Sequence, residues 1–181
     1  LTDHERFVDV GAFDGDTVSD FIRRTQGRFA RIDAFELDRA NFAHLEATVS
    51  ALPHADRIRT FNLGAWHREQ DVTYSVGRSQ STVGRGEATG HVVPLDAVLG
   101  GDSVSFVKID IEGAEPQALQ GARTVIAGQQ PTLAVCVYHH FSHLWQIPSF
   151  IHEVVPEHRI FLRHHTRLEY ETVCYAVPPG R

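Results

Sequence analysis

The chain has 181 residues and a net charge of −6, which fits one acidic domain. Hydrophobic residues make up 42% and charged residues 22%, ordinary values for a globular protein. The acidic balance and the lack of a long basic run argue against nucleic acid as a partner, and no apolar run is long enough to span a membrane. No signal peptide is visible, so we expect a cytoplasmic protein without a membrane partner.

Cysteine and histidine usage bounds the chemistry further. The 2 cysteines, Cys136 and Cys174, both lie in apolar runs typical of strands, so we expect buried free thiols and no disulfide. The 12 histidines form no His-x-Glu-x-x-His motif and no Cys/His cluster. The sequence therefore predicts no bound metal from these residue types.

The first predicted element is a buried strand at residues 7–10, which runs through a glycine loop into a helix. Gly11 allows a sharp turn and lets a ligand approach the backbone closely. Asp16 or Thr17 is the expected N-cap of the helix. This strand–loop–helix unit is the usual nucleotide-binding start of a doubly wound sheet.

The glycine loop is acidic, because it carries Asp9, Asp14 and Asp16 and has no Gly-Lys-Ser/Thr sequence. Three carboxylates would repel a pyrophosphate, so the loop suits a cationic ligand better than a phosphate. The alternative is an ordinary strand–turn–helix with solvated aspartates.

The second and third predicted strands carry the next candidate binding residues. Glu36 ends the strand at residues 31–36, about twenty residues past the loop, where an acid accepts hydrogen bonds from ribose hydroxyls. The alternative for Glu36 is a surface acid at a strand end. After a helix at residues 39–52, a third strand covers residues 58–63.

Asn62, Gly64 and Ala65 follow at the end of this third strand. Small residues there would leave room for an adenine ring, and Asn62 could form a hydrogen bond with that ring. A tight turn packed by Trp66 is the equal alternative. Residues 67–91 then break the strand–helix rhythm, and we interpret them as an inserted, mobile β-hairpin flap. A short strand and one helical turn are expected over residues 92–99.

The fourth core strand, residues 106–112, places Lys108, Asp110 and Glu112 on one side. Three charges on one side of a central strand are costly unless they face each other or a ligand. The remaining elements are expected in this order: a helix at 117–127, a strand at 133–138, a helical stretch at 142–155 broken by Pro148, and an antiparallel hairpin of strands 159–163 and 172–177.

Several of these segments together resemble the FkbM family of S-adenosylmethionine (SAM) dependent methyltransferases. Residues 9–15 (DVGAFDG) resemble motif I of class I methyltransferases, and residues 35–36 and 94–96 also fit the family. The most specific segment is residues 107–115 (VKIDIEGAE), with its Lys-x-Asp-x-Glu-Gly-x-Glu pattern. The resemblance runs from about Phe7 to the last strand, nearly the whole chain, and residues 1–181 are expected to form a single methyltransferase domain.

The resemblance implies a doubly wound, mostly parallel seven-stranded Rossmann-like sheet with an antiparallel final strand. It also implies SAM as cofactor and methylation of a hydroxyl on a sugar or other small natural product. The residues that it assigns to SAM binding are Asp9, Gly11, Phe13, Asp14, Gly15, Glu36, Leu37, Asn62, Gly64, Ala65 and Asp110.

Methyl transfer to a hydroxyl is helped by a base, and the candidates are Asp110 first, then His139 and Glu112. All three are predicted at strand ends facing the ligand crevice. For His139 the alternative is a polar strand end, and for Lys108 a structural ion pair is favoured over a catalytic role. Asp110 and Glu112 could also bind a divalent metal with a third oxygen ligand, as catechol-type methyltransferases do. The rival functions are an NAD-dependent oxidoreductase and a catalytically silent SAM-fold binding module.

Overall fold

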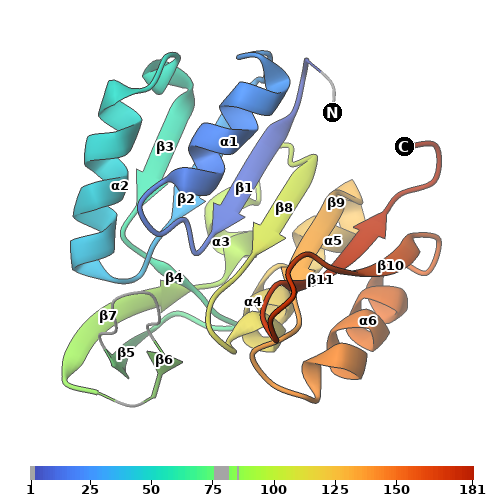
Figure 1. Ribbon diagram of the computed structural model, residues 1–181. Coiled ribbons are helices and arrows are strands. Elements are labelled where there is room, and N and C mark those ends of the chain that lie inside the picture. Colours follow the sequence, from blue (N-terminus) through green and yellow to red (C-terminus); the bar gives the residue numbers. More distant parts are fainter. Residues whose placement is uncertain (1–2, 76–81, 85) are drawn as a thin grey trace.

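A seven-stranded sheet runs through the middle of the protein, with helices on both faces (Figure 1). The computed structural model describes residues 3–75, 82–84 and 86–181. In sheet order the strands are β10 (Arg159–His164), β11 (Thr172–Val177), β9 (Thr132–Cys136), β8 (Phe106–Ile109), β1 (Arg6–Val10), β2 (Arg31–Phe35) and β3 (Ile58–Phe61). β11 is antiparallel to both neighbours and the other pairs are parallel. This confirms the predicted doubly wound sheet with an antiparallel final strand.

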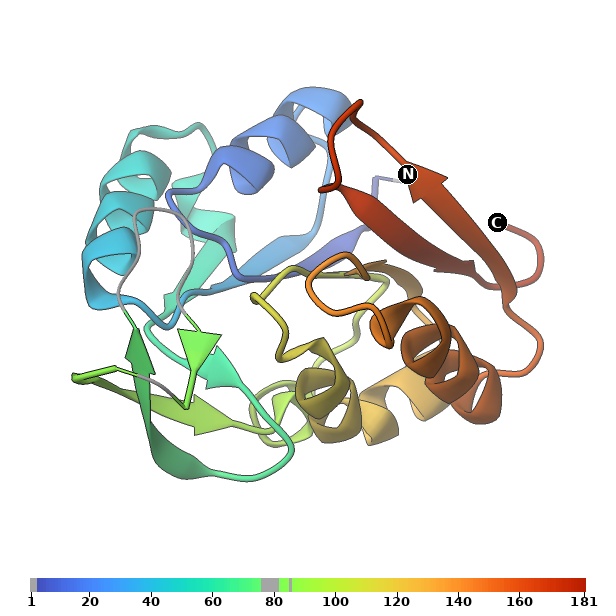
Figure 2. The ribbon, with the colours of Figure 1, turned by 60° about the horizontal axis from the view of Figure 1, so that its bottom comes forward.

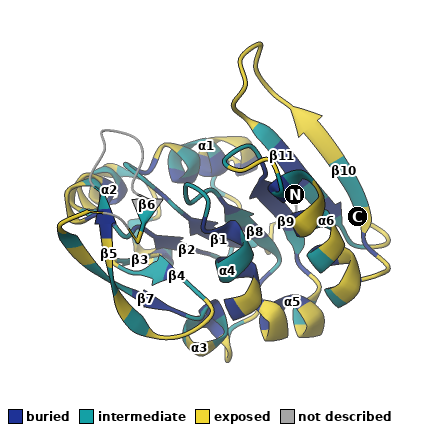
Figure 3. Cartoon of the chain, turned by 90° about the horizontal axis from the view of Figure 1, so that it is seen from below, coloured by how far each residue is buried: buried dark blue, intermediate teal, exposed yellow. Residues whose placement is uncertain are grey.

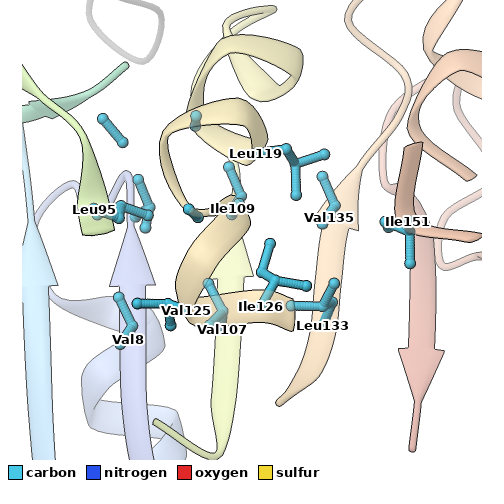
Figure 4. Close-up of a cluster of buried hydrophobic side chains, with 14 of the residues drawn as sticks. Val8, Leu95, Val107, Ile109, Leu119, Val125, Ile126, Leu133, Val135 and Ile151 are labelled. Atoms are coloured by element: carbon cyan, nitrogen blue, oxygen red, sulfur yellow. The ribbon is translucent and has the colours of Figure 1, made fainter. Parts of the chain in front are cut away.

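Alternate residues of the central strands enter two different cores. Phe7 and Ile32 pack with helices α1 (Asp16–Thr25) and α2 (Arg39–Ala51) on one face. Val8 and Val107 pack on the other face, where the core is completed by α3 (Leu95–Leu99), α4 (Glu115–Gly121), α5 (Arg123–Gln129) and α6 (His143–Val154) (Figure 4). Because both faces are covered, the central strands read as near-continuous apolar runs.

The predicted flap is part of a second, four-stranded sheet of order β4-β7-β5-β6. Its strands are β4 (Gly64–Ala65), β5 (Gln70–Ser75), β6 (Thr82–Val83) and β7 (Ala88–Val93). A hairpin at residues 67–91 was predicted, and the structure has a larger sheet that also includes β4. β4 pairs with the end of β7 in parallel, and the pattern of residues within each strand does not reveal such a long-range contact. Residues 76–81 and 85 of the predicted flap lie outside the described residues.

The small sheet is attached to the segment that follows β2. The buried Tyr74 hydroxyl accepts a hydrogen bond from the Arg39 backbone N–H at 3.4 Å. A β-carbon added to Gly90 would lie 2.5 Å from Leu37 Cδ1, so this sheet packs tightly on Leu37. Figure 2 shows the small sheet at one end of the molecule, on the side of α2.

Three helix predictions were wrong in detail, and the first concerns residues 117–127. This stretch forms two helices, α4 and α5, that meet at Ala122. A β-carbon on Gly121 would lie 1.9 Å from the Trp66 carbonyl oxygen, so the chain passes very close to the β4 segment at this point. The Asp96 carboxylate accepts from the Thr124 and Val125 N–H groups at 2.9 and 2.8 Å, which caps the start of α5.

The other two wrong helix predictions concern the effect of Pro148 on α6 and the residue at which α1 starts. α6 continues through Pro148, since only one backbone hydrogen bond is lost there while Ile147 and Ile151 are fully buried on either side. α1 starts at Asp16 with Gly15 as its N-cap and no side-chain cap, in place of the expected Asp16 or Thr17. Gly15 has φ +89°, a left-handed conformation that glycine adopts without strain.

Two further expectations concern the thiols and the last hairpin. Cys136 and Cys174 are buried and free, as predicted, and burial raises the pKa of the Cys174 thiol to about 12. β10 and β11 form the predicted antiparallel pair, although residues 165–171 connect them where only a turn was expected. Among the described residues, no helix combines the length and apolar character that crossing a membrane requires.

We expect Asp96→Ala to lower the free energy of unfolding by about 1 kcal/mol, because the first N–H groups of α5 lose their acceptor. Asp96→Asn retains an acceptor oxygen and should lose less. Urea denaturation measures both, with Glu157→Ala, an exposed acid in the segment before β10, as the control expected to stay near wild type. An Asp96→Ala protein as stable as this control would contradict the capping role.

Candidate functional site

A cavity of about 550 Å³ lies at the carboxyl ends of the central parallel strands. Figure 3 views the sheet from this end, with β8, β1 and β2 side by side in the centre. Ligands of open α/β sheets bind at such an edge, where strand order reverses, and here the reversal lies between β1 and β8. The predicted site residues that line the cavity are Gly11, Phe13, Glu36, Leu37, Gly64, Ala65, Lys108, Asp110 and Glu112.

Gly11 allows β1 and β8 to meet closely at the cavity floor. It has φ +81°, and a β-carbon there would lie 1.9 Å from the Asp110 carbonyl oxygen. Its own N–H donates to the Phe35 carbonyl at 2.9 Å. Only glycine fits a position that is both left-handed and in contact with backbone. Gly11 therefore sets the spacing between the loop after β1 and the acidic end of β8.

Glu36 joins the end of β2 to the glycine loop. Its two carboxylate oxygens accept from the Phe13 N–H at 3.0 Å and from the Asp38 N–H at 2.7 Å. Burial raises the pKa of Glu36, and the two N–H donors offset this only in part. Phe13 has φ +50°, a strained conformation for a side-chain-bearing residue that the Glu36 contact helps to hold. The carboxylate is thus fixed on the cavity wall and keeps unused acceptor capacity there.

Asp9 is not among the residues that line the cavity, and its side chain pairs with Lys108 inside the protein. Its side chain is fully buried, with Oδ1 3.0 Å from Lys108 Nζ. Lys108 Nζ also donates to the Gly11 carbonyl at 2.7 Å. Burial alone would lower the pKa of Lys108, but the Asp9 carboxylate outweighs that and raises it. The structural ion pair favoured for Lys108 is confirmed, and its partner is Asp9.

Three other predicted donor-site residues also lie off the cavity wall. Asn62 Nδ2 donates to the carbonyls of Glu36 at 2.9 Å and Leu37 at 3.1 Å, which leaves the amide engaged with backbone. Asp14 Oδ1 accepts from the Asp16 N–H at 3.3 Å, and Gly15 packs against α2. These residues shape the segments around the cavity rather than its surface.

Asp110 and Glu112 face His139, a partly buried residue at the other end of the cavity. His139 Nε2 lies 3.5 Å from Asp110 Oδ1 and 3.3 Å from Glu112 Oε2. The Tyr138 hydroxyl donates to Asp110 Oδ1 at 3.2 Å. Burial alone would lower the pKa of His139, but Glu115, Asp110 and Glu112 outweigh it and raise that pKa. Burial raises the pKa of Glu112.

Glu115 organises this cluster from below, and its role was not predicted. It is fully buried, with Oε1 2.8 Å from His139 Nδ1 and Oε2 3.3 Å from His143 Nδ1. Oε1 also accepts from the Ile111 N–H at 3.0 Å. Burial alone would raise the pKa of Glu115, but the two histidines and this N–H lower it to about 2. The sequence feature that could have indicated this role is that Glu115 is the last acid of the Lys-x-Asp-x-Glu-Gly-x-Glu segment.

The donor-side wall and the acidic cluster together suit a cationic ligand, as the glycine loop suggested. Lys108 is the cavity-lining cation among the described residues, and Asp9 already neutralises it. Other polar residues that line the cavity were not predicted as site residues. They are Asp16 and Thr17 at the start of α1, Asn41 in α2, Tyr138 after β9, and Tyr170 and Glu171 before β11.

Comparison with known proteins decides the family. Residues 9–168 match the methyltransferase FkbM domain. The chain belongs to the FkbM methyltransferase family. An FkbM methyltransferase from Methylobacillus flagellatus KT is 31% identical in sequence and superimposes with a TM-score of 0.84 over 97% of this chain. This chain spans 44% of that protein's length. No curated protein matches the chain significantly.

More distant methyltransferases share the fold. An rRNA methylase from Streptococcus thermophilus is 11% identical, with a TM-score of 0.61 over 97% of this chain and 86% of its own. TrmK from M. capricolum, solved with its natural cofactor product S-adenosylhomocysteine, is 9% identical, with a TM-score of 0.55 over 100% of this chain and 65% of its own. The FkbM membership confirms the predicted family, and the methyltransferase fold that these proteins share favours it over the NAD-dependent alternative. The absence of a nucleic-acid partner stays a prediction.

Lys108→Met should lower the free energy of unfolding by about 3–5 kcal/mol, because the fully buried Asp9 carboxylate loses its partner. The double variant Asp9→Asn/Lys108→Met should recover much of this loss. Chemical denaturation of the four proteins in the cycle gives the coupling. A double variant that loses the sum of the two single-variant losses, with no coupling, would show that Asp9 and Lys108 do not stabilise each other.

Proposed function

We propose that this FkbM-family protein transfers the methyl group of SAM to a hydroxyl oxygen on a sugar or other small natural product. The observation that carries the proposal is the position of Asp110. Its carboxylate lies on the wall of the same cavity as Glu36, at the end of β8 beside the glycine loop. The acceptor would enter from the side of Tyr138, Tyr170 and Glu171, which line the opposite end.

The end of the cavity near Glu36 offers a suitable surface to each of the three parts of SAM, which are its ribose, its methionine part and its adenine. The Glu36 carboxylate can accept hydrogen bonds from the two neighbouring hydroxyl groups of the ribose. Gly11 and Phe13 would lie along the methionine part, since they form the loop between β1 and α1. The adenine would lie against Leu37, Ala65 and Val92, which give an apolar surface suited to a flat ring.

SAM supplies a methyl group on a sulfonium, which a hydroxyl oxygen attacks in line, so the protein mainly aligns the two reactants. As the oxygen–carbon bond forms, the sulfur–carbon bond breaks and its electron pair stays on sulfur. The hydroxyl proton must leave, and the Asp110 carboxylate accepts it. Negative charge from Asp110 and Glu112 also favours the cationic donor electrostatically.

His139 fits a supporting role better than that of the base. Its Nε2 points to Asp110 and Glu112, its Nδ1 is held by Glu115, and its side chain is 7% exposed. A raised pKa favours the protonated ring, which has no lone pair to accept a proton. This keeps Asp110 as the first candidate and makes His139 the group that positions it.

We expect Glu36→Gln to weaken SAM binding by about 10–100-fold, the equivalent of about 1.5–3 kcal/mol for a hydrogen bond to a charged group. Gln keeps the side-chain size and one acceptor oxygen, so the loop contacts are disturbed less than with Ala. Isothermal titration calorimetry with SAM and S-adenosylhomocysteine measures the change.

Glu171→Gln is the matched control, because Glu171 lines the same cavity from the segment before β11, four strands away from Glu36. It should bind SAM as wild type does. Equal affinities of wild type and Glu36→Gln would remove Glu36 from the donor site.

Asp110→Asn should lower kcat by about 10²–10⁴-fold and leave SAM affinity nearly intact, because Asn cannot accept the proton. The assay is transfer of a labelled methyl group to a panel of sugars, phenols, amines and carboxylic acids, followed by kinetics on the best acceptor. Transfer to nitrogen or to a carboxylate would contradict the acceptor class. A rate restored by saturating SAM would make Asp110 a binding residue, and wild-type kcat with wild-type affinity would place it outside the site.

A further inference from the structure

Glu115 is the first residue of α4, and its buried carboxylate contacts the turn after β8, the segment after β9, and α6. We propose that Glu115 is a positioning residue for methyl transfer, which holds Asp110 and Glu112 in place. It does so through two sets of contacts, one with the turn at residues 111–114 and one with the His139 ring. The kinetic effect rests on the proposed function, whereas the contacts belong to the chain alone.

The first set of contacts holds the turn between β8 and α4. The Ala114 N–H donates to the Ile111 carbonyl at 3.3 Å, and the central residues Glu112 and Gly113 have φ +55° and +100°. A positive φ is strained for Glu112, which carries a side chain. Glu115 Oε1 accepts from the Ile111 N–H at 3.0 Å and from the Gly113 N–H at 3.3 Å, on either side of Glu112. The Glu115 carboxylate therefore stabilises the conformation that places Glu112 on the cavity wall.

The second set of contacts runs through the imidazole of His139. Glu115 Oε1 lies 2.8 Å from its Nδ1. Its Nε2 lies 3.5 Å from Asp110 Oδ1 and 3.3 Å from Glu112 Oε2. The ring thus meets a carboxylate at both nitrogens, and only the form that is protonated at both can donate to both sides. Burial alone would lower the pKa of His139, but the three acids outweigh it and favour the same form.

The protonated ring places a positive charge beside the carboxylates of Asp110 and Glu112. Burial raises the pKa of Glu112, and the His139 cation opposes this effect while Asp110 adds to it. The cation therefore favours the ionised forms of two acids that would otherwise repel each other. Because a ring protonated at both nitrogens has no lone pair, His139 acts here as a cation rather than as a metal ligand.

Glu115 stays ionised although it is fully buried. Burial alone would raise its pKa, but His139, His143 and the Ile111 N–H lower it to about 2. Its Oε2 lies 3.3 Å from Nδ1 of His143, a buried residue of α6. Glu115 is not among the residues that line the cavity. It can thus orient the groups on the cavity wall without contacting either reactant.

The protonation of His139 is tested first in the wild-type protein, without SAM or acceptor. Nitrogen NMR with isotope-labelled histidine at neutral pH shows which ring nitrogens carry protons, and the spectrum of His139→Gln identifies the His139 signal. We expect protons on both nitrogens of this ring. A neutral His139 ring overturns the proposal, whatever reaction the protein catalyses.

Glu115→Gln removes the negative charge but keeps the side-chain size and one acceptor oxygen. We expect it to lower kcat by about 10–100-fold, because small displacements of aligned groups have effects of this size. SAM affinity should stay unchanged, and the His139 signal should become that of a neutral ring. Kinetics use the acceptor that the wild type methylates best, and calorimetry measures SAM binding.

Glu153→Gln is the matched control, because Glu153 is an exposed acid of α6 whose Oε1 lies 2.7 Å from Arg123 Nη2. It should keep the wild-type kcat and His139 signal. A Glu115→Gln protein with wild-type kcat overturns the proposal. Loss of kcat together with SAM affinity, while the His139 signal stays as in wild type, would indicate a merely structural role and overturns it as well.

A second variant keeps the kinetic test available if circular dichroism shows that Glu115→Gln does not fold. His139→Gln removes the cation that Glu115 holds, so it should also lower kcat and leave SAM affinity unchanged. Wild-type kcat in His139→Gln overturns the proposal.

The NMR result does not depend on the reaction, so its failure is separate from that of the proposed function. Transfer to nitrogen or to a carboxylate would contradict the proposed acceptor class. The lower kcat of Glu115→Gln would still be expected with such an acceptor, because Asp110 and Glu112 line the cavity in either case.

Discussion

The contact between Gly11 and Asp110 is the constraint on which the site depends. The left-handed glycine lies directly against the Asp110 carbonyl, with no room for a β-carbon. Beneath it, Lys108 binds both the Asp9 carboxylate and the Gly11 carbonyl. The loop that would hold the donor and the carboxylate that would receive the acceptor proton are therefore parts of one rigid junction. Catalysis by alignment needs such a fixed distance between the two reactants.

The charge distribution follows from the same junction. Lys108 is neutralised within the protein by Asp9, so the cavity presents Glu36, Asp110 and Glu112 without a compensating cation on its described walls. This arrangement disfavours phosphate ligands and favours a sulfonium. It also explains the buried Glu115–His139 pair, because two carboxylates at one end of a cavity need a partner that can offset their repulsion.

The sequence predicted the parts of the fold that local patterns determine. Apolar runs predicted the strands, the glycine loop predicted that a helix follows β1, and the position of Glu36 at a strand end predicted its place on the cavity wall. It failed where distant segments decide the outcome. The sequence did not show that Asp9 pairs with Lys108, or that the Asn62 amide donates to the Glu36 carbonyl. The α4–α5 break depends on Trp66 and Asp96, which lie far away in sequence.

The central claim is that SAM binds across the junction of β1 and β8. Hydrogen–deuterium exchange with and without S-adenosylhomocysteine tests it most directly, because a bound ligand slows the exchange of the segments that it orders. The account predicts added protection in residues 10–17, 35–38 and 108–113, with β10 and α5 unchanged as internal references. Saturating ligand that protects none of these three segments, or protects a different face of the sheet, would contradict it.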